Sequence, residues 1–106
     1  MQYQEIYEPE TLSRAELDAS KGLVVVEFGS NWCGHCRAAQ AGIAQALSGM
    51  PDGQHIKVED GPGRRLGRSF RVKLWPTLII MKDGQELARG VRPDDEVLQA
   101  LVAAAG

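Results

Sequence analysis

The only two cysteines of this 106-residue chain, Cys33 and Cys36, lie three positions apart in the segment Asn31–Arg37 (NWCGHCR). On the first turn of a helix, thiols at this spacing are close enough to form a small disulfide. They also lie near the free N–H groups and the positive end of the helix dipole, which lower the pKa of the first thiol. The spacing therefore predicts a thiol pair that does redox chemistry.

The two thiols are expected to have different roles. Cys33 should be the more exposed thiol and attack a disulfide, whereas Cys36, one turn deeper, should resolve the mixed disulfide by attacking Cys33. His35 lies between them. An imidazole near the Cys33 sulfur stabilises the thiolate, which favours the reduced form and makes the disulfide more oxidising.

Three other uses of such a pair fit the sequence less well. A structural disulfide closing so short a loop constrains the unfolded chain little, and a cytosolic protein would keep it reduced. A zinc site needs a second half, but there is no second C-x-x-C and His55 stands alone, so we expect neither a metal nor a chemical role for His55. Haem attachment requires a histidine where Arg37 follows Cys36.

The composition is that of an ordinary folded protein, with 43% hydrophobic and 25% charged residues. We expect one domain over residues 1–106 and a monomer. A formal net charge of -2 gives no reason to expect nucleic-acid binding. The apolar runs are too short to span a membrane, and the N-terminus MQYQEIYEPE has no secretory leader, so a cytoplasmic protein is expected. A chain trimmed of its signal would have the same sequence.

Periodicity and turn residues predict alternating strands and helices in the order β-α-β-α-β-α-β-β-α. A capping box, Ser13 with Glu16, opens the first helix, and Asp83-Gly84 predicts a hairpin turn. The expected strands cover residues 3–7, 23–28, 55–59, 77–82 and 85–89, and the expected helices cover 11–19, about 33 to before 51, 64–70 and 93–105. The fold class is α/β, a mixed β-sheet of four to five strands flanked by helices on both faces.

Several of these features together resemble the thioredoxin family over nearly the whole chain from Leu23 onward. They are a strand that ends in Glu27-Phe28, the WCGHC segment that opens a helix, and Trp75-Pro76-Thr77 before a hairpin that carries Lys82-Asp83-Gly84. The resemblance implies the thioredoxin fold, with Cys33 and Cys36 as the redox pair. It also implies a cis peptide bond before Pro76 beside the disulfide, and backbone pairing of Trp75 with an extended client peptide.

The sequence also departs from the family pattern. His35 replaces the proline of typical thioredoxins, as in protein disulfide isomerase domains, and Glu27 replaces a buried aspartate. Gly29 replaces a tryptophan, and Ala41 and Gly42 occupy the stretch of a helix-kinking proline. These differences bear on the redox potential and the choice of clients more than on the chemistry.

The resemblance also assigns supporting roles. From the residues alone, Glu27 could be a solvent-facing strand carboxylate, but the match to a buried acid favours a role in catalysis. Desolvation should then raise its pKa and let it accept the Cys36 proton, directly or through water. Lys57 matches a lysine that neighbours this acid and would tune it, although periodicity alone is equally consistent with an exposed lysine.

A client groove is expected around the cysteines. Trp32 and Trp75 could be core aromatics, but both flank the motif. We therefore assign substrate binding to six residues: Trp32, Gly34, Trp75, Pro76, Gly90 and Val91.

The sequence thus predicts a protein disulfide oxidoreductase that serves electron transport and cell redox homeostasis. Its partners would be disulfide-containing client proteins and a recycling enzyme such as thioredoxin reductase, with no cofactor other than the Cys33–Cys36 disulfide. The alternative is a non-catalytic thioredoxin-fold interaction module or redox sensor. The direction of electron flow stays open, because the absence of a leader favours a reductant and His35 favours a less reducing potential.

Overall fold

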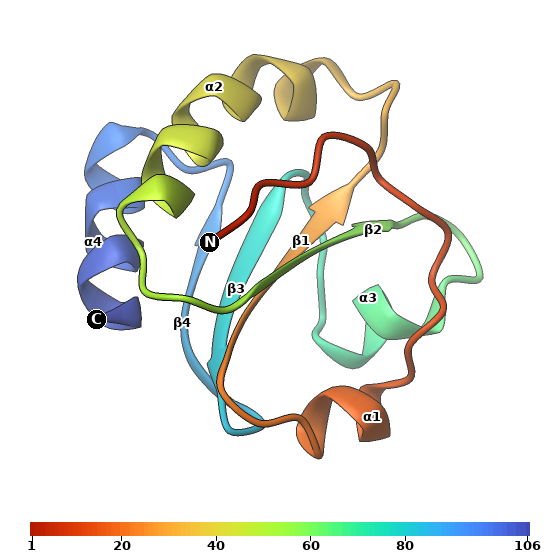
Figure 1. Cartoon of the computed structure of the whole chain (residues 1–106). Helices are drawn as coiled ribbons and strands as arrows, with labels where there is room; N and C mark the ends of the chain where they lie inside the picture. Colours follow the sequence, from red (N-terminus) through yellow and green to blue (C-terminus); the bar gives the residue numbers. More distant parts are fainter.

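The computed structural model describes all residues from 1 to 106. Along the chain its elements are α1 (Arg14–Asp18), β1 (Leu23–Gly29), α2 (Gly34–Ser48), β2 (Gln54–Glu59), α3 (Arg65–Ser69), β3 (Thr77–Lys82), β4 (Gln85–Val91) and α4 (Asp95–Ala105). Figure 1 shows the strands in one sheet between two groups of helices.

The sheet has four strands in the order β2-β1-β3-β4. β1 runs parallel to β2 and antiparallel to β3, and β3 runs antiparallel to β4. All seven residues of β1 are buried, as expected for a run of β-branched residues in a central strand covered on both faces. The predicted mixed sheet is therefore confirmed.

The side chains of β1 alternate between two hydrophobic cores. Leu23 and Val25 pack with residues of α2 and α4, whereas Val24, Val26 and Phe28 pack with residues of α1 and α3. This places α2 and α4 on one face of the sheet and α1 and α3 on the other (Figure 1). Helices on both faces were predicted, and the structure confirms them.

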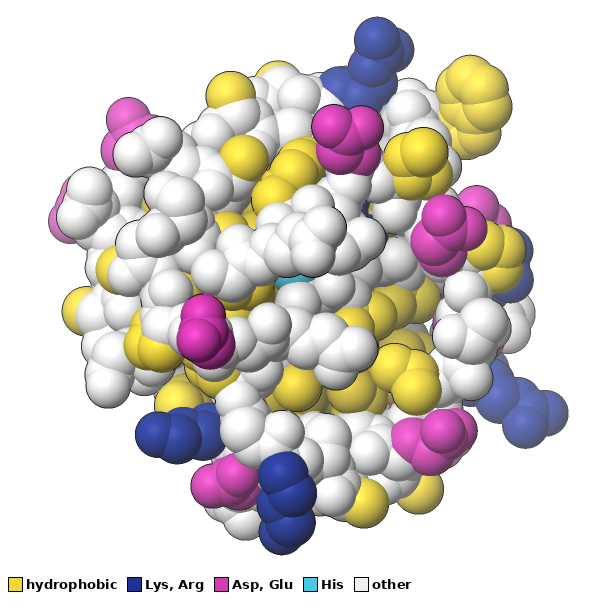
Figure 2. All heavy atoms as spheres, in the orientation of Figure 1, with side chains coloured by type: hydrophobic (Ala, Val, Ile, Leu, Met, Phe, Trp, Pro, Cys, Tyr) yellow, Lys and Arg dark blue, Asp and Glu magenta, His cyan; other side chains and the backbone are white.

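The predicted first strand, residues 3–7, is wrong. This segment forms no strand, and only an isolated parallel bridge joins Glu8 to Val58. Side chains hold the segment in place instead of a ladder of backbone hydrogen bonds: the N–H of Gln4 donates to Nδ1 of His55, and the N–H of Tyr7 donates to Oδ1 of Asn31. The segment crosses the face shown in Figure 2, where acidic and basic side chains are interspersed and hydrophobic ones show between them.

Local signals in the sequence placed most helix ends correctly. The capping box of α1 is present, with Ser13 and Glu16 each accepting from the other's backbone N–H at 3.1 Å. Helix α2 begins after Cys33, which is its N-cap, and ends before Pro51. The short helix expected over 64–70 is α3.

The predicted Asp-Gly hairpin between β3 and β4 is also confirmed. Asp83 and Gly84 both have positive φ, 51° and 79°, as the type I′ turn that matches strand twist requires. The turn packs against the segment before β1, because the N–H of Gly22 donates to Oδ1 of Asp83 and the N–H of Asp83 donates to the carbonyl of Gly22.

Two glycines with the same backbone conformation allow a controlled test of this packing. Gly63 and Gly84 have φ of 78° and 79°, but a Cβ at Gly63 would meet nothing within 4 Å, whereas one at Gly84 would lie 1.9 Å from the carbonyl oxygen of Asp18. In urea unfolding, Gly63→Ala should lower the free energy of unfolding by about 1 kcal/mol through left-handed strain. Gly84→Ala should lower it by a further ~1–3 kcal/mol through overpacking. Equal losses would contradict this packing.

Candidate active site

Cys33 and Cys36 lie where β1 passes into α2. Cys33 is the N-cap of the helix, and its sulfur accepts a hydrogen bond from the N–H of Cys36 at 3.2 Å. Both thiols are free, Cys33 partly exposed and Cys36 fully buried at 0% exposure. This is the division of exposure expected for an attacking and a resolving thiol.

The surroundings shift the two thiols in opposite directions. Burial raises the pKa of Cys33, but hydrogen bonds from the Cys36 side chain and from the N–H groups of Cys36 and His35, with the positive charge of Arg92, lower it overall. Burial and the neighbouring Cys33 sulfur raise the pKa of Cys36 to about 11. At neutral pH the thiolate therefore forms preferentially on Cys33.

His35 contributes its backbone N–H to this site. Its side chain is exposed, and the stabilisation of the Cys33 thiolate comes from the backbone N–H of His35. The first turn of a helix leaves such N–H groups without helical partners, so the sulfur at the N-cap takes them as donors. The lowering of the Cys33 pKa that the structure accounts for therefore belongs to the helix start.

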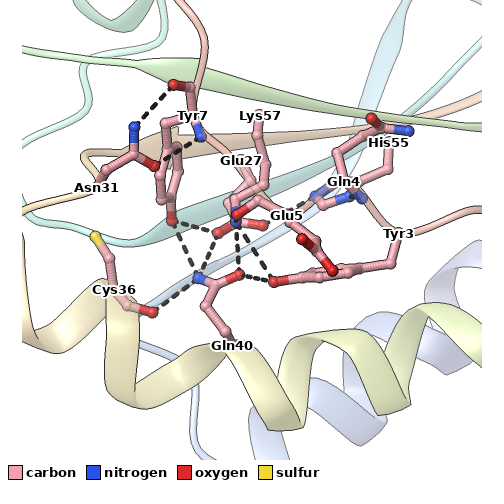
Figure 3. Close-up of polar contacts among 10 residues, drawn as sticks. All are labelled: Tyr3, Gln4, Glu5, Tyr7, Glu27, Asn31, Cys36, Gln40, His55 and Lys57. Carbon is pink, nitrogen blue, oxygen red and sulfur yellow. Dashed lines mark hydrogen bonds and ion pairs between the residues drawn. The ribbon is translucent and has the colours of Figure 1, made fainter.

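Glu27, on β1, is fully buried at 0% exposure, which excludes the alternative of a solvent-facing carboxylate. Its Oε1 contacts Nε2 of His55 at 2.9 Å, and its Oε2 accepts from Nε2 of Gln40 at 2.9 Å and from the hydroxyl of Tyr7 (Figure 3). The other ring nitrogen of His55 accepts from the N–H of Gln4. That contact assigns the His55 proton to Nε2, so the neutral imidazole donates to Glu27.

The expected rise in the pKa of Glu27 is wrong. Burial does raise the pKa, but the hydrogen bonds from His55, Tyr7 and Gln40 and the positive charge of Lys57 outweigh it, so that the pKa is lowered overall. The expected rise considered desolvation without these hydrogen-bond donors, and His55 was expected to have no chemical role. Glu27 is therefore a carboxylate at neutral pH.

Lys57 is buried, with 4% exposure, and not the exposed lysine that periodicity allowed. Its ammonium group donates to the carbonyl of Glu5 at 2.7 Å and to Oε1 of Gln40 at 2.8 Å. The amide of Gln40 in turn donates to Glu27 and to the carbonyl of Cys36, the latter at 2.7 Å. Gln40 thus links Lys57, Glu27 and the cysteine helix, although nothing in its spacing had indicated this.

The six residues assigned to a client groove are not all alike. Trp32 is 90% exposed, and Val91 and Gly34 are also exposed. Trp75 is half-buried, and its indole N–H donates to Oδ2 of Asp60 at 2.9 Å. Pro76 and Gly90 are buried. The Trp75–Pro76 bond is cis, as the resemblance implied. Thr77 pairs with Val91 and Leu78 pairs with Gly90. This pairing brings Trp75, Pro76, Gly90 and Val91 to one end of the sheet.

The backbone of Trp75 is only partly free for the client pairing that was expected. Its N–H has no hydrogen-bond partner within the chain, but its carbonyl accepts from Nε of Arg92 at 2.9 Å. Arg92 has a positive φ of 47° and also donates its backbone N–H to the carbonyl of Pro76 at 2.8 Å. Nothing in the sequence indicated a role for Arg92, which lies near enough to Cys33 to lower the pKa of that thiol.

Two general properties concern cofactors and membranes. No group of three or more His, Cys, Asp or Glu side chains is placed to hold a metal ion. None of the helices has the length and apolar character needed to cross a bilayer.

The difference between the two thiols predicts selective alkylation. When the reduced protein is treated with iodoacetamide at neutral pH, Cys33 should be modified and Cys36 should remain free, because Cys36 is buried and its pKa is about 11. Peptide mass spectrometry reads out each site. Cys33→Ser serves as the control and should label only after denaturation. Equal labelling of both thiols in the native protein would contradict the assignment.

Comparison with known proteins agrees with this geometry. A family sequence model described as Thioredoxin matches residues 7–104. Thioredoxin H-type 1 of Nicotiana tabacum is 34% identical over 83 residues, which are 78% of this chain and 66% of that protein. Thioredoxin-2 of Pyricularia oryzae is 32% identical over 85 residues, covering 80% of this chain and 50% of that protein. The chain thus spans half to about two thirds of these curated relatives.

A solved structure gives a fuller match. The structure of thioredoxin 2 from Pseudomonas aeruginosa PAO1 in its reduced form is 52% identical and covers 98% of each chain with a TM-score of 0.85. The match to the family model and the match to this structure both extend across the β1–α2 junction that carries the two cysteines. The chain belongs to the thioredoxin family.

Proposed function

We propose that this chain is a thiol–disulfide oxidoreductase that reduces or exchanges disulfides in client proteins. The observation that carries the proposal is the paired geometry of a partly exposed Cys33 with a lowered pKa and a buried Cys36 with a raised pKa, joined at the start of one helix. An attacking thiol needs exposure and thiolate character, and a resolving thiol needs protection from solvent and proximity to its partner.

The reaction follows from these two positions. The Cys33 thiolate attacks one sulfur of a client disulfide, the client S–S bond breaks, and the other client sulfur leaves as a thiolate. Cys36 then attacks the Cys33 sulfur, the mixed disulfide breaks, and the second client sulfur is released as the Cys33–Cys36 disulfide forms. Two electrons pass from the protein to the client. A recycling reductase, of the thioredoxin reductase kind, returns them, and the disulfide is the only redox group required.

Glu27 is the acceptor of the Cys36 proton in the second step. While Cys33 is a thiolate, its charge and its hydrogen bond help to raise the pKa of Cys36. In the mixed disulfide that charge is gone, so Cys36 becomes easier to ionise. Glu27 is ionised and buried, and it receives the proton as the Cys36 sulfur attacks.

Client binding is assigned to the end of the sheet next to Cys33. Trp32 and Val91 present exposed apolar surface, and the free N–H of Trp75 can pair with an extended client segment. Gly34 belongs to the same proposed surface, and the buried Pro76 and Gly90 are assigned to the backbone beneath it. The chain is proposed to act as a single domain over residues 1–106 and as a monomer, in the cytoplasm.

The function is tested by the activity and the reduction potential of the pair. The reduced protein should reduce insulin disulfides, and both Cys33→Ser and Cys36→Ser should abolish turnover. Equilibration in graded thiol–disulfide buffers should give a potential near the roughly -270 mV of thioredoxin for a reductant, or near the roughly -180 mV of disulfide isomerase for an oxidant or isomerase. If no Cys33–Cys36 disulfide forms and the serine variants keep the biological effect, the chain is an interaction module instead.

The role of Glu27 predicts a separate kinetic effect. Glu27→Gln should lengthen the lifetime of the mixed disulfide by roughly 100-fold, the lower end of the range for general base catalysis, without slowing attack by Cys33. Stopped-flow release of thionitrobenzoate from Ellman's reagent separates the two steps. Thermal unfolding of the variant controls for the loss of a buried network. An unchanged mixed-disulfide lifetime would rule out Glu27 as the proton acceptor.

A further inference from the structure

The hydroxyl of Tyr7 lies between the carboxylate of Glu27 and the sulfur of Cys36 (Figure 3). It donates to Oε2 of Glu27 and accepts from Nε2 of Gln40 at 3.3 Å. A Cβ placed on Gly29 would lie 2.8 Å from this hydroxyl and 2.6 Å from Sγ of Cys36. The hydroxyl and the sulfur therefore border the same small space beside the backbone of Gly29.

Gly29 is what allows both side chains to approach this space. Any side chain at position 29 would overlap both the Tyr7 ring and the Cys36 sulfur, and the family pattern has a tryptophan there. In this chain the space is occupied by Tyr7, which arrives from the N-terminal segment and not from β1. The Glu27 side chain is one methylene longer than the aspartate of the family pattern and reaches the phenol from the adjacent core.

Tyr7 is firmly positioned. Its backbone makes two hydrogen bonds with the side chain of Asn31, N–H to Oδ1 at 2.9 Å and carbonyl to Nδ2 at 3.1 Å. The residue is 3% exposed, and the ammonium group of Lys57 lies 4.3 Å from the centre of its ring. Asn31 is two positions before Cys33, so the loop that carries the redox pair also fixes the tyrosine.

We propose that the Tyr7 hydroxyl relays the proton of the Cys36 thiol to Glu27 during resolution of the mixed disulfide. The inference rests on the proposed function and specifies a step within it. As Cys36 attacks the Cys33 sulfur, its S–H proton passes to the Tyr7 oxygen while the Tyr7 O–H proton passes to Oε2 of Glu27. The phenol ends as it began, Glu27 becomes a neutral acid, and the client sulfur leaves with the electron pair of the broken S–S bond.

The other members of the cluster cannot carry this proton. His55 contacts the opposite oxygen of Glu27, and its second nitrogen is held by the N–H of Gln4. Gln40 has only amide protons, which do not exchange in such a step. The ammonium group of Lys57 is directed at oxygens of Glu5 and Gln40. Tyr7 is the group with a transferable proton that donates to Glu27 and also lies next to the Cys36 sulfur beside Gly29.

The ionisation of the phenol is consistent with a relay that never leaves a tyrosinate. Burial, followed by the charge of Glu27 and the hydrogen bond to it, raises the pKa of Tyr7 far above its usual range. The oxygen therefore keeps one proton before and after the step, and the transfer is a concerted exchange and not a two-stage ionisation.

The chain supplies a matched control, because it contains only two tyrosines. The hydroxyl of Tyr3 also contacts Gln40 and Lys57 but not Glu27. In stopped-flow reduction of Ellman's reagent, Tyr7→Phe should slow the resolving phase by at least about tenfold and leave the attack phase unchanged. This effect is smaller than the roughly 100-fold loss expected for Glu27→Gln, because water can partly replace the phenol as the relay. Tyr3→Phe should leave both phases at the wild-type rate. A wild-type resolving phase in Tyr7→Phe would overturn the relay.

A double variant tests whether Tyr7 and Glu27 act as one unit. If the phenol serves only to pass the proton to Glu27, the variant carrying both Tyr7→Phe and Glu27→Gln should resolve no more slowly than the slower single variant. Multiplication of the two effects would overturn the relay. Loss of the attack phase in the wild-type protein would instead contradict the proposed function, so the two failures are distinguishable.

A measurement on the wild-type protein avoids any effect of the variants on folding. The resolving rate is followed in mixtures of light and heavy water. If two protons are transferred in the step, a plot of the resolving rate against the deuterium fraction should curve downward. A straight line, which the transfer of one proton gives, would overturn the relay even if Tyr7→Phe slowed the resolving phase.

Discussion

A carboxylate with no solvent exposure is stable only where donors surround it, and the charge of Glu27 sets this requirement for the whole site. The donors come from three separate parts of the chain: His55 from β2, Gln40 from α2 and Tyr7 from the N-terminal segment. These contacts fix α2 against the sheet. They also hold the N-terminal segment across β2 without a strand, so one buried charge organises four segments.

The same arrangement separates the roles of the two cysteines. The start of α2 presents backbone N–H groups to Cys33, while the first turn of the helix carries Cys36 into the protein interior. The departures from the family pattern are related to one another. Gly29, at the position where the family pattern has a tryptophan, leaves room for Tyr7 beside the Cys36 sulfur, and the longer acid Glu27 accepts the hydrogen bond of the Tyr7 hydroxyl.

Local rules predicted most of the fold and half of the site. The β-branched run of β1, the capping box at Ser13 and the hairpin at Asp83-Gly84 are encoded by neighbouring residues, and the structure has all three. The prediction of a first strand was wrong because side chains from distant elements hold that segment in place. The prediction of a raised pKa for Glu27 was wrong for the same reason. The hydrogen-bond donors of Glu27 lie 13 to 28 residues away in sequence, and none belongs to a recognisable motif.

The charge state of Glu27 is the central claim, and titration of its side-chain carboxyl carbon by NMR in the reduced protein tests it most directly. The account predicts a titration below the usual glutamate pKa of about 4.3, because the three donors and Lys57 stabilise the charged form. The same resonance should move again when Cys36 ionises near its raised pKa of about 11. Titration near or above neutral pH would mean a neutral buried acid, and would contradict the account.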